Sequence, residues 1–399
     1  MLKDRQCYGF LALTMKILNA HLNLIKLFSY FLIALGCSLA FGITLSFYSE
    51  SFSSLNHTHF QTPQNLSTTS ATVSPPSPPP PPPPIPEVLR LPTSSNNDVE
   101  VMSDEELMWR ASMTPMNTQV GVPKVAFLFL VKGSIPFAPL WEKFFKGHQG
   151  FYSVYVHSDP SFNSSSSLSG MDDGVFRGRR IPSQEVEWGK FSMVEAELRL
   201  LANALLDDPS NQRFVLLSES CIPLFNFTTI YSYLINATQT YIESYDLVGP
   251  TGRGRYKSQL GPTVTVRQWR KGSQWFELDR DMAVQVISDQ GYFLLFKRAC
   301  KSSCYADEHY LPTWVNMNKL GARKNSNRSL TWVDWSKGGW HPARYRRTHI
   351  TIEFLERLRG KETCEYNGKV TNICYLFARK FLPDTLYRLM IYAPRVMHF

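Results

Sequence analysis

The chain has 399 residues, with 42 Lys and Arg against 33 Asp and Glu (formal charge +9) and 43% hydrophobic residues. That apolar content excludes a wholly disordered chain. Ten of the 26 prolines lie between Pro75 and Pro86, where neither a helix nor a central strand can form. The seven cysteines show no two CxxC pairs at zinc-site spacing, so a structural zinc is not expected. The positive charge indicates an anionic partner, which could be nucleic acid, a membrane surface or a phosphorylated ligand.

Residues 27–48 form an uncharged apolar run of 22 residues, and about 20 such residues span a bilayer. A cleaved signal peptide is the alternative, but this run is longer than an ordinary signal h-region. Basic residues precede the run, and the first charge after it is Glu50. The positive-inside rule then makes residues 1–26 a cytosolic tail, and the protein a single-pass type II membrane protein.

Residues 49–119 are rich in Ser, Thr, Asn and Pro and are predicted to be a disordered stem. Its proline run favours polyproline II, so it would act as a semi-rigid spacer; a PxxP ligand for a cytosolic domain is the competing reading. Six N-x-S/T sequons fit a lumenal location. They are Asn56, Asn65, Asn163, Asn226, Asn236 and Asn327.

From residue 120 onward, apolar strands alternate with helices, which predicts an α/β fold over 120–399 whose ligands lie beyond the carboxyl ends of the strands. A Ser192/Glu195 pair in capping-box spacing predicts a helix start. The predicted strands are KVAFLFLV (124–131), FYSVYVH (151–157), RFVLLSES (213–220) and YDLVG (245–249).

A hairpin is predicted where Asn367-Gly368 separates two short segments ending in Cys364 and Cys374. Asn-Gly is a strong turn signal, and an oxidising lumen permits disulfides. The hairpin would bring the two sulfurs together, so we expect a Cys364–Cys374 bond. Cys300 and Cys304 are a second candidate pair.

Two acidic segments could carry chemistry. Asp159 ends the strand at VYVHSDP, where it could accept a hydrogen bond from a base or ribose, or simply cap a turn before Pro160. Asp307, Glu308 and His309 stand together at a helix start. They could supply a general base, or they could be acids that favour the helix macrodipole.

Basic and aromatic residues cluster toward the C-terminus. The forked guanidinium groups of arginine and the point charge of lysine suit a diphosphate, although a solvated basic face is the usual explanation for such a cluster. Exposed indoles stack on sugar rings, although buried core tryptophans are commoner. The residues are Arg344, Arg346, Arg347, Arg379, Lys380, Trp332, Trp335 and Trp340.

Several segments occur in an order that resembles the core-2/I-branching N-acetylglucosaminyltransferase family, and its plant branch in particular. They are KVAFLFLV, VYVHSD, VEWGKFSMVEAELRLL, FVLLSESCIPL, QWFELDRDMA, CYADEHYLPT and YLFARKF. The resemblance implies a GT-A-type nucleotide-diphosphosugar transferase (Rossmann-like) fold in a type II Golgi membrane protein. It also implies inverting transfer from a UDP-sugar to a glycan or glycoprotein hydroxyl.

The resemblance also implies roles for individual residues. Glu308 matches the family's general base, and Lys380 matches its C-terminal phosphate-binding lysine. The animal members work without a metal, so no cofactor is expected besides the UDP-sugar substrate. Further UDP-sugar contacts are expected at Val131, Asp159, Arg344, Arg347 and Arg379, and acceptor contacts at Glu219, Trp332 and Trp335.

Several alternatives remain open. Asp279 and Asp281 spell a DxD that could hold a metal, although Asp279 is also placed to cap a helix. The first-guess donor is UDP-N-acetylglucosamine, with UDP-glucuronic acid as the alternative. A catalytically silent Golgi glycan-binding or scaffold protein, or a structural wall protein, is the competing function. A nucleic-acid partner is not expected.

Overall fold

A computed structural model describes residues 102–116, 121–162, 174–301, 304–339 and 341–399. No helix in these ranges is long and apolar enough to cross a membrane. The predicted cytosolic tail (1–26) and membrane span (27–48) lie outside the described residues, as do most of the predicted stem and three of the six sequons.

The described chain alternates strands and helices, which confirms the α/β class. The strands are β1 (Lys124–Leu130), β2 (Tyr152–His157), β3 (Asn211–Ser218), β4 (Ile222–Pro223), β5 (Glu277–Asp279), β6 (Thr331–Val333), β7 (Cys364–Tyr366), β8 (Lys369–Thr371) and β9 (Phe377–Arg379). The helices are α2 (Asp104–Ser112), α3 (Ala138–Phe145), α4 (Ser192–Asp207), α5 (Phe227–Ile235), α6 (Arg280–Ile287), α7 (Gly291–Ala299), α8 (Tyr310–Met317), α9 (Lys319–Lys324), α10 (Ile352–Gly360) and α11 (Leu386–Tyr392).

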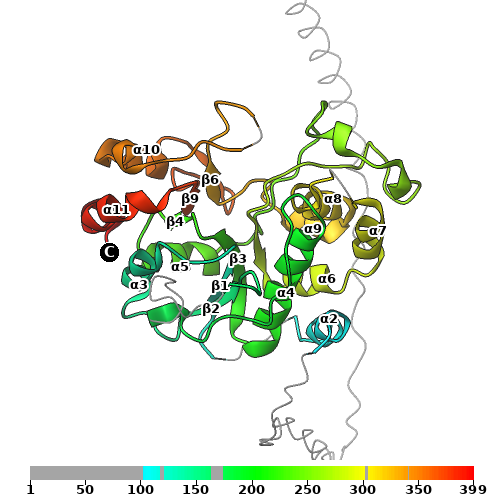
Figure 1. The fold of residues 1–399 in the computed structure, drawn as a ribbon, viewed down its shortest axis with the longest axis horizontal. Helices are drawn as coiled ribbons and strands as arrows, with labels where there is room; N and C mark the ends of the chain where they lie inside the picture. Colours follow the sequence, from blue (N-terminus) through cyan, green and yellow to red (C-terminus); the bar gives the residue numbers. More distant parts are fainter. Residues whose placement is uncertain (1–101, 117–120, 163–173, 302–303, 340) are drawn as a thin grey trace, which may run out of the picture. The chain divides into compact units, whose positions relative to one another are not determined.

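The main sheet has the order β2-β1-β3-β5 (Figure 1). β1 pairs in parallel with both β2 and β3, and β5 pairs antiparallel with β3. The continuous apolar runs of β1 and β3 are buried along almost their whole length, as is typical of strands covered on both faces. The predicted strand 245–249 does not form: Tyr245 makes only an isolated antiparallel bridge with Lys271.

Alternate side chains of β1 enter two different cores. Phe127 and Phe129 belong to the core under α3, α5, α10 and α11, whereas Ala126 and Leu128 belong to the core under α4, α6 and α8. C-terminal residues complete the first core. The rings of Phe127 and Phe377 are 6.3 Å apart, and those of Phe144 and Phe399 are 5.6 Å apart.

A second small sheet joins β4 to two strands of the C-terminal part, which also contains a hairpin. The sheet has the order β4-β9-β6. β7 and β8 form the predicted hairpin, with Asn367 and Gly368 both at positive φ in its turn. The predicted Cys364–Cys374 disulfide is present, and Cys300 bonds to Cys304.

The folded unit begins earlier than the predicted boundary at residue 120. Ser103 caps α2 through its hydroxyl, and Ala111 is fully buried. Asp104 pairs with Arg199 of α4, and Arg280 of α6 donates to the carbonyl of Pro115. The short polar helix gives a weak apolar pattern, which predicts a stem segment, but the helix packs on the α/β fold.

The α4 start is at the predicted residue, but its cap differs. Ser192 is the first helical residue rather than the N-cap, which is Phe191 and makes no side-chain cap hydrogen bond. The Ser192 hydroxyl instead accepts a hydrogen bond from the backbone N–H of Glu187. It therefore fastens the loop that precedes the helix.

Candidate active site

A cavity of about 640 Å³ opens at the carboxyl ends of the parallel strands. Its lining includes Val131 after β1, Asp159 after β2, and Glu219 after β3. This is the edge where open α/β sheets bind ligands, because successive strand ends and their loops converge there.

Glu308 lines this cavity from the short turn Ala306–Glu308 that precedes α8. Its Oε2 accepts a hydrogen bond from Arg255 Nη1 at 2.5 Å and from Lys271 Nζ at 2.8 Å. Both cations therefore bind the same oxygen. Among the described residues Oε1 has no hydrogen-bond partner, so it remains available to a ligand in the cavity.

Backbone geometry places Lys271 beside Glu308. Lys271 is fixed by its two-way backbone pairing with Tyr245, and the next N–H, from Gly272, donates to the carbonyl of Glu308. A Cβ at Gly272 would lie 1.8 Å from the carbonyl oxygen of Glu243. Glycine is therefore required where this segment passes the backbone of Glu243.

The acidic segment holds three ionisable groups in different protonation states. Burial alone would raise the pKa of Glu308, but Lys271 and Arg255 hold it below its ordinary value, so the group is a carboxylate at neutral pH. Burial and the adjacent Glu308 raise the pKa of Asp307 to about 7. Burial lowers the pKa of His309 to about 3, so that ring is neutral.

Arg379 and Lys380 form a basic wall of the same cavity. The Arg379 guanidinium lies over the Trp275 ring, 4.0 Å from its centroid. Neither residue has a carboxylate within ion-pair distance among the described residues. Burial lowers the pKa of Arg379, and burial together with Arg379 lowers that of Lys380. An anionic ligand would relieve both penalties.

Arg344 and Arg347 are not in the lining of this cavity. Both are exposed, and Arg347 lies over the Tyr387 ring at 5.3 Å. Arg344 is near enough to Lys380 to help lower the pKa of that lysine, after burial and Arg379. Neither arginine therefore lines the cavity, although Arg344 lies close to Lys380 of the basic wall.

Asp159 caps a turn, and its position in the cavity lining leaves the predicted contact with a base or ribose as a prediction. Its Oδ1 accepts from the backbone N–H of Ser161 at 2.9 Å and from the Ser161 hydroxyl at 2.6 Å, so it caps a turn. It also lines the main cavity and a neighbouring one of about 610 Å³. The two cavities share Lys132, Asp159, Glu219 and Lys380.

The two acceptor tryptophan candidates are separated. Trp335 lines the cavity and is 48% exposed. Trp332 does not line it: its ring packs near Tyr345 and Phe354 against the core. Trp332 therefore packs against the core, which is the commoner role of a tryptophan.

The DxD lies at the other edge of the sheet. Asp279 is opposite Arg213, near the start of β3, whereas the cavity is at the end of that strand. Asp279 caps α6 through the N–H of Met282. Lys324 Nζ lies 3.1 Å from Asp281 and 3.9 Å from Asp279. Both carboxylates therefore face a lysine, outside the candidate site.

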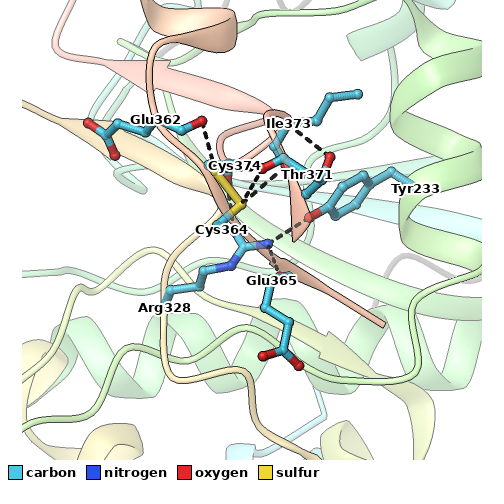
Figure 2. Close-up of a disulfide and its surroundings, with 8 residues drawn as sticks. All are labelled: Tyr233, Arg328, Glu362, Cys364, Glu365, Thr371, Ile373 and Cys374. Atoms are coloured by element: carbon cyan, nitrogen blue, oxygen red, sulfur yellow. Dashed lines mark hydrogen bonds between the residues drawn. A yellow bond between two sulfur atoms is a disulfide. The ribbon is translucent and has the colours of Figure 1, made fainter. Parts of the chain in front are cut away.

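The hairpin contributes a further wall, since both disulfide sulfurs belong to cavity-lining residues. Arg328 joins the hairpin to the core (Figure 2). It donates to the Cys374 carbonyl at 2.6 Å, to the Tyr233 hydroxyl at 2.6 Å and to the Glu365 carbonyl at 3.3 Å. This network fixes the hairpin wall.

Three sequons lie in the described residues. Asn226 caps α5 by accepting from the N–H of Thr229. Asn327 is exposed and accepts from the N–H of Ser244. Asn236 is exposed at the end of α5. These hydrogen bonds of Asn226 and Asn327 use the amide oxygen and leave the nitrogen, which is the atom that carries an N-glycan.

Sequence reasoning missed Arg255, Lys271, Arg328 and Trp188 as lining or supporting residues. Arg255 and Lys271 lie in a loop region without apolar periodicity, 53 and 37 positions before Glu308. No local pattern connects residues at that separation. The only available signal was that this loop is rich in Arg, Lys and Gly.

Comparison with known proteins identifies a family and a relative. The family model described as Core-2/I-Branching enzyme matches residues 125–359. Glycosyltransferase BC10 of Oryza sativa subsp. japonica is 32% identical over 315 residues, which cover 68% of this chain and 77% of that protein.

Proposed function

The chain belongs to the Core-2/I-Branching enzyme family of glycosyltransferases, and from that premise we propose that its cavity transfers a sugar from a UDP-sugar to a hydroxyl of a glycan or glycoprotein by inverting displacement. The observation that carries the proposal is the position of Glu308. Its ionised carboxylate lines the same cavity as two basic residues that lack carboxylate partners among the described residues.

Glu308 is the general base of the proposed reaction. The acceptor oxygen forms a bond to the anomeric carbon while the bond from that carbon to the UDP oxygen breaks, and the acceptor proton passes to the carboxylate. Oε1 is suited to receive it, because Arg255 and Lys271 occupy Oε2. Positioned general bases typically contribute about 10²- to 10⁴-fold to a rate.

Arg379 and Lys380 are the proposed partners of the departing diphosphate. Negative charge accumulates on UDP as the glycosidic bond breaks, and fixed cations in a partly buried site stabilise it without reorganisation. We therefore expect no metal requirement. Asp279 and Asp281 are unsuited to that role here, since they pair with Lys324 at the far edge of the sheet.

The remaining assignments rest on the family and on the sequence. UDP-N-acetylglucosamine is the first donor to test and UDP-glucuronic acid the second. The parallel sheet with its cavity fits a GT-A-type fold. Residues 27–48 would anchor the enzyme in the Golgi membrane as a type II protein, with the stem (49–119) and the catalytic domain (120–399) in the lumen.

The test is UDP release by the purified full-length protein with a panel of UDP-sugars, with and without EDTA. Glu308→Gln is compared with Glu356→Gln, an exposed glutamate of α10 that does not line the cavity. We expect Glu308→Gln to lose at least about 100-fold and Glu356→Gln to match the wild type.

Each alternative has its own outcome. Full activity in Glu308→Gln would refute the base assignment. Loss of activity in EDTA would refute the metal-free mechanism. A protein that binds no UDP and releases none would be the catalytically silent glycan-binding or scaffold member.

A further inference from the structure

Helix α2 precedes the residues that the family model matches, yet it is fastened to the centre of the α/β fold. The match begins at residue 125, whereas α2 spans Asp104–Ser112. The helix packs beside α4 and α6 (Figure 1). Its first residue, Asp104, binds Arg199 of α4 through both carboxylate oxygens, at 2.7 and 2.6 Å. A bidentate pair of this kind holds the guanidinium in one orientation, and the other groups that bind the guanidinium are held with it.

The other contacts of Arg199 lead to the cavity. Its Nη2 donates to the side-chain oxygen of Gln184 at 2.7 Å, and its Nη1 lies 3.5 Å from Nε2 of His157. The backbone N–H of Gln184 donates to the same His157 nitrogen at 3.3 Å. His157 ends β2 and lines the cavity. Because Arg199 is only 3% exposed, little water competes for these contacts.

These contacts orient the His157 ring. Both partners of Nε2 are N–H donors, so Nε2 carries the lone pair and the proton is assigned to Nδ1. Burial and then the Arg199 charge lower the pKa of this histidine to about 4, which keeps the ring neutral. Nδ1 is buried without a hydrogen-bond partner among the described residues. The hydrogen bonds that orient the ring are therefore those at Nε2.

The segment 180–184 also holds the loop that follows β2. Ser183 Oγ accepts a hydrogen bond from the backbone N–H of Ser158 at 3.3 Å. Arg180 Nη2 donates to the carbonyl of Asp159, a cavity-lining residue, at 2.7 Å. Because the buried guanidinium on α4 also binds this segment, α2, α4 and the end of β2 are joined in one hydrogen-bonded network.

We propose that Asp104 and Arg199 are positioning residues for the donor, which hold His157 and Asp159 in the arrangement that binds a UDP-sugar. This rests on the proposed function, which supplies the donor. Neither positioning residue belongs to the cavity lining, so each acts through the end of β2 and not by touching the ligand. Helix α2 is then part of the donor site, and loss of the Asp104 carboxylate weakens UDP binding while the bond-breaking step is unchanged.

The competing explanation is that the Asp104–Arg199 pair only stabilises the fold, and the chain offers a matched control for it. Lys124 pairs with Asp208 at 2.7 Å, and the two side chains are 26% and 21% exposed. Lys124 is the first residue of β1, at the opposite end of that strand from the cavity. Lys124→Met therefore breaks a partly buried ion pair without touching the end of β2.

The first measurement needs no ligand. Hydrogen exchange of the full-length protein in detergent is followed by mass spectrometry in peptides that cover residues 156–162 and 179–184, whose backbone N–H groups donate across to each other. We expect Asp104→Asn to speed exchange in both segments by about fivefold or more, and Lys124→Met to leave it at the wild-type rate. Unchanged exchange in Asp104→Asn, or equal acceleration in the two variants, would overturn the proposal.

The second measurement is the affinity for UDP by isothermal titration calorimetry, together with kcat and KM for the UDP-sugar that the wild type uses. All variants are compared at one temperature, well below the Tm of each. We expect Asp104→Asn to raise the Kd of UDP and the donor KM about tenfold and to leave kcat within about threefold. Asp104→Glu keeps the carboxylate and should stay within about threefold of the wild type in Kd and KM, as should Lys124→Met.

The outcomes separate this role from the reaction. An active enzyme whose Kd for UDP is the same with and without the Asp104 carboxylate refutes the positioning role and leaves the proposed function standing. A rise in Kd that Lys124→Met reproduces also refutes it, because general destabilisation would then explain both. If the wild type binds no UDP and turns over no UDP-sugar, the proposed function fails, and the exchange comparison still decides whether α2 holds the end of β2.

Discussion

Asp104 is predicted to anchor the first described helix to the catalytic fold. Its two carboxylate oxygens accept from Arg199 Nε at 2.7 Å and from Arg199 Nη2 at 2.6 Å. Arg199 is only 3% exposed, whereas Asp104 is 31% exposed. Asp104→Asn removes the charge and one of the two acceptors. The buried guanidinium then has only uncharged side-chain partners among the described residues: the remaining amide oxygen at position 104, Gln184 and the His157 ring.

The expected cost lies between two limits. Breaking a fully buried ion pair costs about 3–5 kcal/mol, and a surface pair is worth about 0–1 kcal/mol. Because one partner is buried and the other is one-third exposed, we expect Asp104→Asn to lower the free energy of unfolding by about 2–3 kcal/mol. For a folded unit of this size that corresponds to a fall in Tm of about 5 °C.

The assay is thermal unfolding of the full-length protein, and the control is on the same helix. Glu106 pairs with Arg110 at 2.5 Å, but the two side chains are 46% and 51% exposed. Glu106→Gln should therefore cost less than about 0.5 kcal/mol. Equal effects of Asp104→Asn and Glu106→Gln would refute the reasoning and would make α2 a loosely attached segment, as the sequence suggested.

Three further changes have defined outcomes. Lys271→Met removes one of the two cations that hold the pKa of Glu308 low. The acid limb of the profile of kcat/KM against pH should therefore move up by about 1–3 pH units. An acid limb that stays at the same pH would contradict this role of Lys271. The folded-state pKa of Asp307 is raised to about 7. Between about pH 4 and 7 the folded protein therefore binds more protons at this group than the unfolded chain does. The stabilisation that protonated Asp307 gives the folded state is lost as the pH rises through that window. Asp307→Asn should remove that part of the slope of Tm between pH 5 and 8, and an identical slope would show that Asp307 does not titrate there. Cys364→Ser opens a loop closed by Cys374 ten positions later and should cost about 2.5 kcal/mol in unfolding free energy, whereas an unchanged Tm would show that the bond contributes nothing.

Local patterns predicted the parts of the fold that local physics decides. The apolar runs at 124–131, 151–157 and 213–220 became β1, β2 and β3, because a run of branched and aromatic side chains has few alternatives to a buried strand. The Asn-Gly turn and the disulfide that closes it followed from turn geometry. The cavity at the carboxyl edge followed from the parallel order of the strands.

The unpredicted features depend on tertiary contacts. Asp104 gives α2 its anchor only because Arg199, far along the chain, is buried opposite it. The cations on Glu308 come from loop segments without periodicity, and Trp332 turned inward because Tyr345 and Phe354 lie beside it. In each case a residue's role was set by a partner that no spacing rule connects to it.

One of the two hydrophobic cores is completed only by C-terminal residues, and this affects how the chain folds while it is being synthesised. Phe127 of β1 packs against Phe377, about 250 residues later, and ribosomes add roughly 5–20 residues per second. The rings of α3 that also pack on Phe127 follow β1 closely, but the Phe377 side of this face stays uncovered for on the order of 10–50 seconds while the remaining chain is made. During that interval KVAFLFL is an incompletely covered strand of high β-propensity and few charges, the kind of segment that aggregates if it is not protected. The yield of folded enzyme should depend on whatever covers β1 before β9 arrives.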